Sequence, residues 1–87
     1  MNWIEIKESI SEDLMTRGLS DPNIRLRALD RVELILKKEF PKYLQNPSAE
    51  FGKIDKEQFK ASIAKYKPKG RLTGAESSVI NEIYYRI

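Results

Sequence analysis

The sequence predicts an all-α fold, a compact bundle of about four helices with a long second helix at its centre. Two observations lead to this prediction. Apolar residues recur at helical spacing along most of the chain, and capping residues stand where each period begins, at Asn2, Asp21, Asp55 and Thr73. Such agreement between independent local signals is typical of a sequence that specifies one structure. The length of 87 residues allows a single domain, residues 1–87, with one modest core.

The first predicted helix begins after Asn2, which is a good N-cap, and Glu5 follows at the position of a capping-box partner. Gly18 should end this helix in the left-handed conformation, so that Leu19 contacts Leu14 in a Schellman motif. The apolar stripe consists of Trp3, Ile6, Ile10 and Leu14.

The second predicted helix begins at Asp21, with Pro22 at the first helical position, where its missing N–H group is harmless. It extends to about Phe40, or past Pro41 to Leu44 with a kink. Its apolar residues span an arc of about 200°, which is much wider than a surface helix needs. Other helices, or a second subunit in a homodimer, must therefore cover this arc on two sides. The arc consists of Ile24, Leu26, Ala28, Leu29, Val32, Ile35, Leu36 and Phe40, with Leu29, Val32 and Leu36 near its centre.

Two features of the second helix go beyond core packing. Glu39 lies inside the apolar arc, where it either reaches solvent or pairs with a lysine, or else is a buried carboxylate with a raised pKa. On the opposite side, three cations and one leucine form a narrow strip. This basic ridge is either an ordinary solvated face or a contact surface for an acidic protein or a phosphate backbone. The basic ridge consists of Arg27, Arg31, Leu34 and Lys38.

Two further helices complete the predicted bundle. Residues 45–54 contain proline and glycine and are typical of a loop. The third helix opens at Asp55, with Gln58 as its capping-box partner and with Ile54 and Phe59 as a hydrophobic staple. The fourth helix opens at a second capping box, Thr73 with Glu76. The apolar positions are Phe59, Ile63 and Tyr66 in the third helix, and Val79, Ile80, Ile83, Tyr84 and Ile87 in the fourth.

The net charge of +3 is unevenly distributed, because residues 1–34 sum to −2 and residues 35–87 to +5. The densest segment is the basic run, residues 65–71, with four positive charges and no acid. It leads into the start of the fourth helix, whose free N–H groups favour phosphate. Within it, Tyr66 is placed to stack on a base or, alternatively, to join the core beside a solvated turn. The predicted nucleic-acid-binding residues are Lys65, Tyr66, Lys67, Lys69 and Arg71.

The composition argues against catalysis. The chain has no cysteine and no histidine, which removes thiolate nucleophiles, the commonest general base and the commonest metal ligands. The neighbouring acids Glu12 and Asp13 point to different sides of a helix, and Asp55 and Glu57 belong to a helix start. We therefore expect no enzyme activity, no metal and no cofactor. The chain shows no targeting signal and no apolar stretch long enough to span a bilayer, so we expect a cytoplasmic protein without a membrane partner.

Two functions from different classes remain open. The first is a nucleic-acid-associated accessory or regulatory protein that binds phosphates through the basic run. The second is a protein-interaction module, such as an inhibitor, an adaptor or a small subunit, that uses the basic ridge or the outer face of the fourth helix around Tyr85. A helix-turn-helix would expose four polar residues of the fourth helix, but the connection before it is longer than that motif's usual turn. Those residues are Ser77, Ser78, Asn81 and Tyr85.

Overall fold

The computed structural model describes residues 2–45, 49–66 and 72–87 and forms an all-α bundle over these ranges. The four predicted helices are all present, and one short helix and one 3-10 turn join them. The elements are α1 (Trp3–Thr16), α2 (Pro22–Glu39), α3 (Lys42–Gln45), η1 (Phe51–Lys53), α4 (Lys56–Ala64) and α5 (Gly74–Arg86). The predicted fold class is therefore confirmed.

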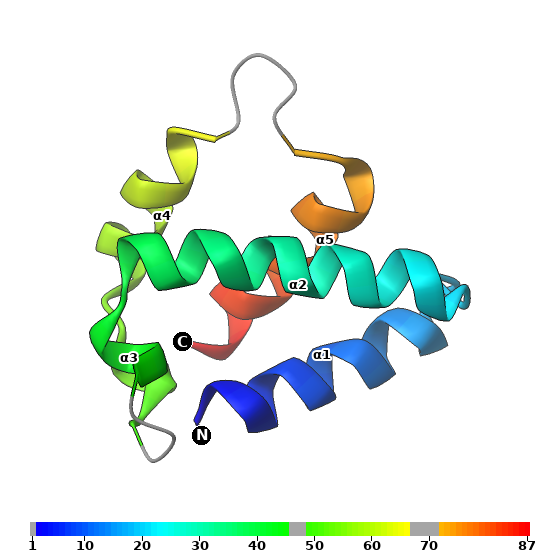
Figure 1. The fold of residues 1–87 in the computed structure, drawn as a ribbon, viewed down its shortest axis with the longest axis horizontal. Coiled ribbons are helices and arrows are strands. Elements are labelled where there is room, and N and C mark those ends of the chain that lie inside the picture. Colours follow the sequence, from blue (N-terminus) through cyan, green and yellow to red (C-terminus); the bar gives the residue numbers. More distant parts are fainter. Residues whose placement is uncertain (1, 46–48, 67–71) are drawn as a thin grey trace.

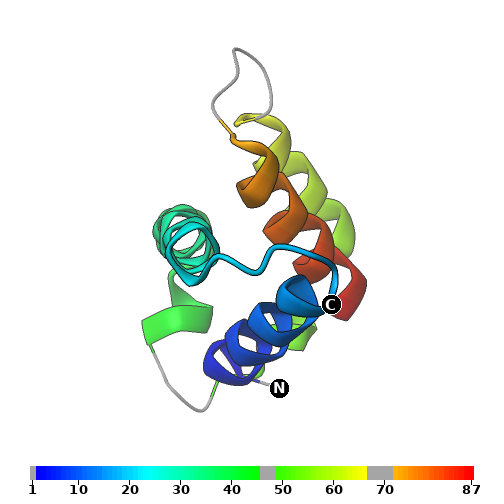
Figure 2. The ribbon, with the colours of Figure 1, turned by 90° about the vertical axis from the view of Figure 1, so that its right-hand side faces the viewer.

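Helix α2 is the central element, as predicted. It crosses the whole front of the molecule in Figure 1, with α1 below it and α5 behind it. It packs against α1, α3 and α5, while α1 also packs against α5. Figure 2 shows α4 and α5 side by side, running in opposite directions. The 18 residues of α2 are about 27 Å long, which nearly equals the longest extent of the molecule, 30 Å.

The ends of α1 follow the predicted caps. The side chain of Asn2 accepts a hydrogen bond from the Glu5 N–H at 2.9 Å, and Glu5 accepts one from the Asn2 N–H at 3.0 Å. Gly18 has φ of +104°, a conformation that glycine adopts without the steric cost of a Cβ atom. The Leu19 N–H then donates to the Leu14 carbonyl at 2.9 Å. This is the Schellman hydrogen bond, and it directs the chain back toward α2.

Helix α2 ends at Glu39 and does not continue through Pro41. Phe40 has φ −135° and ψ 56°, outside the helical region, because a residue before proline is pushed away from the α conformation. The alternative of a kinked helix reaching Leu44 was therefore wrong, and α3 is a separate short helix.

The core confirms the predicted centre of the α2 arc. Leu29, Val32 and Leu36 are at most 1% exposed. The arc is narrower than predicted, however, because Ile24 and Leu26 are 49% and 50% exposed. Helices α1 and α5 cover the strip centred on Val32, and the two exposed residues lie on its flanks. The chain's own helices therefore bury the centre of α2 without a second subunit.

The segment predicted as a loop supplies a core residue. Phe51, in η1, is fully buried, and its ring lies 5.2 Å from that of Trp3 and 6.4 Å from that of Tyr43.

The start of α4 follows only part of the predicted capping pattern. Asp55 accepts a hydrogen bond from the Glu57 N–H at 3.2 Å, but Gln58 does not complete the expected capping box.

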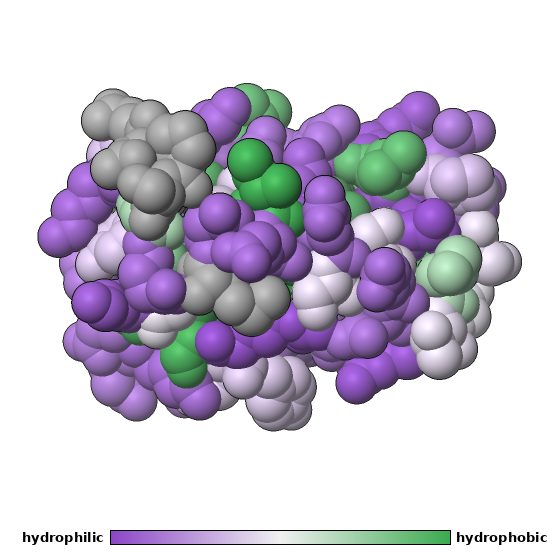
Figure 3. Space-filling view, turned by 90° about the horizontal axis from the view of Figure 1, so that it is seen from below, coloured by the Kyte–Doolittle hydropathy of each residue, from purple (hydrophilic) through white to green (hydrophobic). Residues whose placement is uncertain are grey.

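The surface on the α1 side is mainly hydrophilic, with scattered hydrophobic residues (Figure 3). Scattered apolar residues are normal on a folded domain and need no partner. No helix in the described ranges is both long and apolar enough to cross a bilayer.

Candidate nucleic-acid interface

The outward face of α5 carries no charge. A capping box fixes the start of this helix, and apolar side chains on its inner face hold it against α1 and α2. Every exposed residue of α5 is uncharged, although charged residues make up 33% of the chain. Asn81 and Tyr85 stand one turn apart on this face, and Tyr85 is 75% exposed. We call these residues the α5 strip: Ser77, Ser78, Asn81, Tyr84 and Tyr85.

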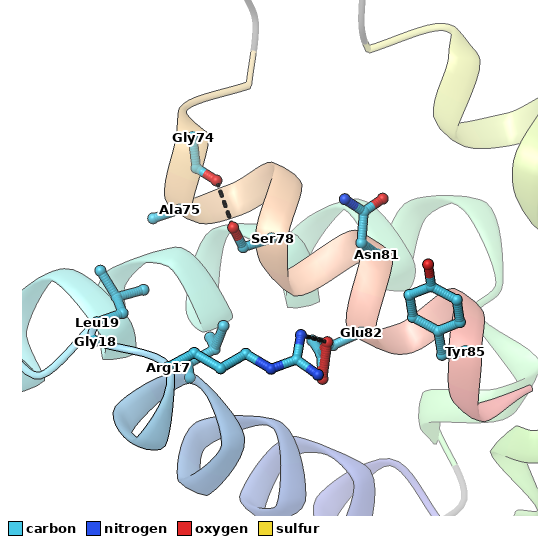
Figure 4. Close-up of a pocket in the computed structure, with 10 residues that line it drawn as sticks. Arg17, Gly18, Leu19, Gly74, Ala75, Ser78, Asn81, Glu82 and Tyr85 are labelled. Atoms are coloured by element: carbon cyan, nitrogen blue, oxygen red, sulfur yellow. Dashed lines mark hydrogen bonds and ion pairs between the residues drawn. The ribbon is translucent and has the colours of Figure 1, made fainter.

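A hollow lies on each side of the α5 strip. The larger one, about 670 Å³, separates α5 from the end of α1 and includes Arg17 and Glu82 in its wall (Figure 4). The smaller one, about 240 Å³, lies between α4 and α5 and has Lys60 at its edge. Asn81 and Tyr85 line both hollows. The α5 strip therefore lies between two hollows, and a partner can approach it from either side.

Two residues in the wall of the larger hollow, Arg17 and Glu82, belong to a network of four charges. The buried carboxylate of Glu82 accepts hydrogen bonds from Arg17 Nη1 at 2.7 Å and from Arg86 Nη1 at 3.0 Å, and Arg86 Nη2 also donates to Asp13. Each acid thus has a guanidinium partner. This network was not predicted from the sequence, although spacings of four residues between Asp13 and Arg17 and between Glu82 and Arg86 indicate the two helical faces.

The start of the basic run is held against α2. Lys65 Nζ lies 3.4 Å from Glu39 Oε2, and the Tyr66 hydroxyl donates to Glu39 Oε1 at 3.0 Å. Glu39 therefore pairs with a lysine, which is one of the two alternatives that the sequence left open. The lysine side chain is still 65% exposed, so its ammonium group remains accessible. The predicted residues Lys67, Lys69 and Arg71 lie outside the described residues.

The predicted phosphate position at the start of α5 already holds a carboxylate. Thr73 Oγ1 accepts from the Glu76 N–H at 3.1 Å, and Glu76 Oε2 accepts from the Thr73 N–H at 3.1 Å. The other oxygen of Glu76 lies 3.0 Å from Arg31 Nε. A phosphate at this helix end would meet that carboxylate, which disfavours phosphate binding at this position.

The basic ridge lies on the outward face of α2. Leu34 is 66% exposed. Arg27 and Lys38 are also exposed and form no ion pair with the described residues, whereas Arg31 is paired with Glu76. The four predicted residues therefore share one accessible face, on which two cations border an apolar side chain.

A different charge cluster joins α1 to α2. Glu33 accepts from the Trp3 indole N–H and from Lys7, and Lys7 also donates to Asp30 at 3.1 Å. Partial burial by itself would raise the pKa of Glu33, but the Trp3 hydrogen bond and the Lys7 ammonium outweigh it and hold the pKa below its ordinary value. Lys37 adds an i,i+4 ion pair with Glu33 at 3.7 Å. This cluster stabilises the contact between two helices.

Among the described residues, no group of three or more acidic side chains comes close enough together to hold a metal ion. Comparison of the chain with protein-family models, curated proteins and solved structures finds no match. Its function must therefore be inferred from geometry and charge.

Proposed function

We propose that the chain is a non-enzymatic, cytoplasmic, nucleic-acid-associated accessory or regulatory protein. One observation carries the proposal: the uncharged α5 strip is bordered by the exposed lysines of α4. Lys56 and Lys60 form no ion pair with the described residues, and α4 leads directly into the basic run, residues 65–71.

This combination suits a phosphate backbone. Each lysine that neutralises a phosphate releases counterions, and this release drives binding without regard to sequence. The α5 strip has no carboxylate to repel a strand that lies across it. Its hydroxyl and amide groups can donate hydrogen bonds to phosphate or sugar oxygens.

The test is a salt titration of binding to an arbitrary single-stranded oligonucleotide, followed by fluorescence anisotropy. On a single strand, three to five phosphate contacts give a log–log slope of roughly −2 to −3.5. Replacing Lys67, Lys69 and Arg71 together by alanine should flatten this slope by about two units. Absence of binding at low salt would refute the proposal.

A matched control separates local contacts from net charge. Replacing Arg27, Lys38 and Lys42 by alanine removes the same three charges from exposed positions on α2 and α3. The log–log slope of this control should differ from that of the parent by less than about half of the change that one phosphate contact produces. Equal flattening by both triple variants would mean that only the overall charge matters, and the basic run would then have no special role.

A second function is favoured by the basic ridge. Leu34 is exposed between Arg27 and Lys38, two cations without ion pairs to described residues. An apolar anchor with a cationic border fits an acidic protein partner. In this case the chain acts as an inhibitor, an adaptor or a small subunit.

Pull-down from native extract after nuclease treatment tests this second function. Leu34→Asp should abolish retention of a specific partner, because it places a charge at the anchor. Leu26→Asp is the matched control, since Leu26 is half exposed on a different flank of α2. Equal retention by both variants would exclude the basic ridge as the contact surface.

A further inference from the structure

The smaller hollow is an apolar groove with a polar edge. Its floor is formed by Phe59, Ile63 and Ile80, which are buried core residues. The groove is open to solvent, with a volume of about 240 Å³. Its described lining contains one cation, Lys60, and no carboxylate.

The tyrosine beside this groove is unusually exposed. Tyr85 is 75% exposed, the highest value among the exposed large hydrophobic residues of the described chain. Its ring lies 6.3 Å from that of Tyr84 in an edge-to-face arrangement. Tyr84 is in turn covered by Lys56, whose ammonium lies 5.0 Å from the ring centroid. One ring is thus held in place, and the other presents a free aromatic surface.

Asn81 completes the site. Its side chain projects from the same face of α5 as Tyr85 (Figure 4) and lines the groove. It forms no side-chain hydrogen bond with the described residues. A free amide has both donors and acceptors, which is the pattern needed to pair with the edge of a nucleobase.

We infer that the α4–α5 groove is a base-binding subsite for single-stranded nucleic acid. One unpaired base stacks on Tyr85 with its edge toward Asn81, and the neighbouring phosphate lies at Lys60. This inference rests on the proposed nucleic-acid function and specifies its ligand. Aromatic side chains bordered by cations are how proteins hold single strands. A duplex keeps its base faces stacked, so it has no free base for this groove.

The experiment compares a short single-stranded DNA with the duplex of the same sequence, by anisotropy at fixed salt. The parent should prefer the single strand. Tyr85→Ala should weaken binding of the single strand by roughly 5- to 150-fold, the usual effect of losing one stacked base. Tyr85→Phe retains the ring and should bind like the parent. Ile4→Ala is the control, because it truncates another exposed side chain, on α1.

A second readout reports stacking directly. A fluorescent base analogue, 2-aminopurine, within the strand loses emission when it stacks, so its emission should fall with the parent and with Tyr85→Phe but not with Tyr85→Ala. Asn81→Ala should bring the affinities for adenine, cytosine and thymine homopolymers closer together, because the amide reads base edges.

The outcomes separate this inference from the function on which it rests. If Tyr85→Ala binds the single strand as tightly as the parent, the subsite is refuted. If it weakens single strand and duplex equally, Tyr85 contacts the backbone and the subsite is also refuted. In both cases the nucleic-acid function is still supported if the triple alanine variant of the basic run flattens the log–log salt slope. If no nucleic acid binds at low salt, both proposals fail, and a protein partner becomes the explanation of the α5 strip.

Discussion

The inner and outer faces of α5 are built from different kinds of residue. On the inner face, the acids Glu76 and Glu82 are buried, and each pairs with an arginine from another helix. On the outer face, Asn81 and Tyr85 are exposed, and neither forms a side-chain hydrogen bond with the described residues. Groups that are already paired stabilise the fold, whereas accessible groups without partners are available to a ligand. The comparison therefore separates residues that hold α5 in place from residues that can bind.

The largest expected effect concerns the core against which the inner face packs. Leu36 is fully buried in α2, so Leu36→Ala should lower the free energy of unfolding by about 2–5 kcal/mol. Urea denaturation measures this change. Leu34→Ala, at an exposed position of the same helix, should stay within about 0.5 kcal/mol of the parent. A loss below about 1 kcal/mol for Leu36→Ala would contradict the central position of α2.

The next effect concerns the network on the inner face. Glu82→Ala leaves two arginines without their shared carboxylate, and Arg86 is largely buried. We expect a loss of about 1–3 kcal/mol, below the value for a fully buried pair because Arg17 is 67% exposed and screened by solvent. The control is Glu8→Ala, which removes an exposed acid from α1. The loss is measured by thermal or urea unfolding. If the two variants lose the same free energy of unfolding, the network does not stabilise the bundle.

A smaller effect concerns the pH dependence of the α1–α2 contact. Because the pKa of Glu33 is lower in the folded protein than the ordinary value of 4.5, the ionised form stabilises the fold. This contribution is fully present above about pH 4.5 and is lost as the pH falls through the folded-state pKa. Glu33→Gln should therefore be less stable than the parent at neutral pH, by under about 1 kcal/mol at this partly exposed site.

Urea midpoints measured over a range of pH values check this sign. The difference between the parent and Glu33→Gln should shrink as the solution is made more acidic. A difference that grows on acidification would mean that the protonated form of Glu33 is the stabilising one, contrary to the Trp3 and Lys7 contacts.

The caps and the centre of the core could be predicted because they depend on short-range spacing. The Asn2 and Thr73 capping boxes require partners three residues away, and Gly18 needs only its own backbone conformation. The burial of Val32 follows from its place at the middle of the apolar arc. Each of these features is fixed within a few residues of sequence.

The rest depends on which elements meet in space. Phe51 lies in a segment without helical periodicity, so no pattern marks it as a core residue, and only its contact with Trp3 does. The pairing of Arg17 with Glu82 joins α1 to α5 across 65 positions. The groove beneath Tyr85 exists only because α4 packs beside α5. Helical spacing predicted an exposed Tyr85 but gave no sign of that groove.

The most direct test of the binding face compares two double variants in the same salt titration. Lys56→Ala with Lys60→Ala removes the lysines that border the α5 strip, and Arg27→Ala with Lys38→Ala removes two exposed cations from α2. We expect the first pair to flatten the log–log slope for single-stranded DNA by about 1.4 units, and the second pair to leave the slope unchanged. Flattening by the α2 pair alone would contradict the assignment of the binding face to α4 and α5.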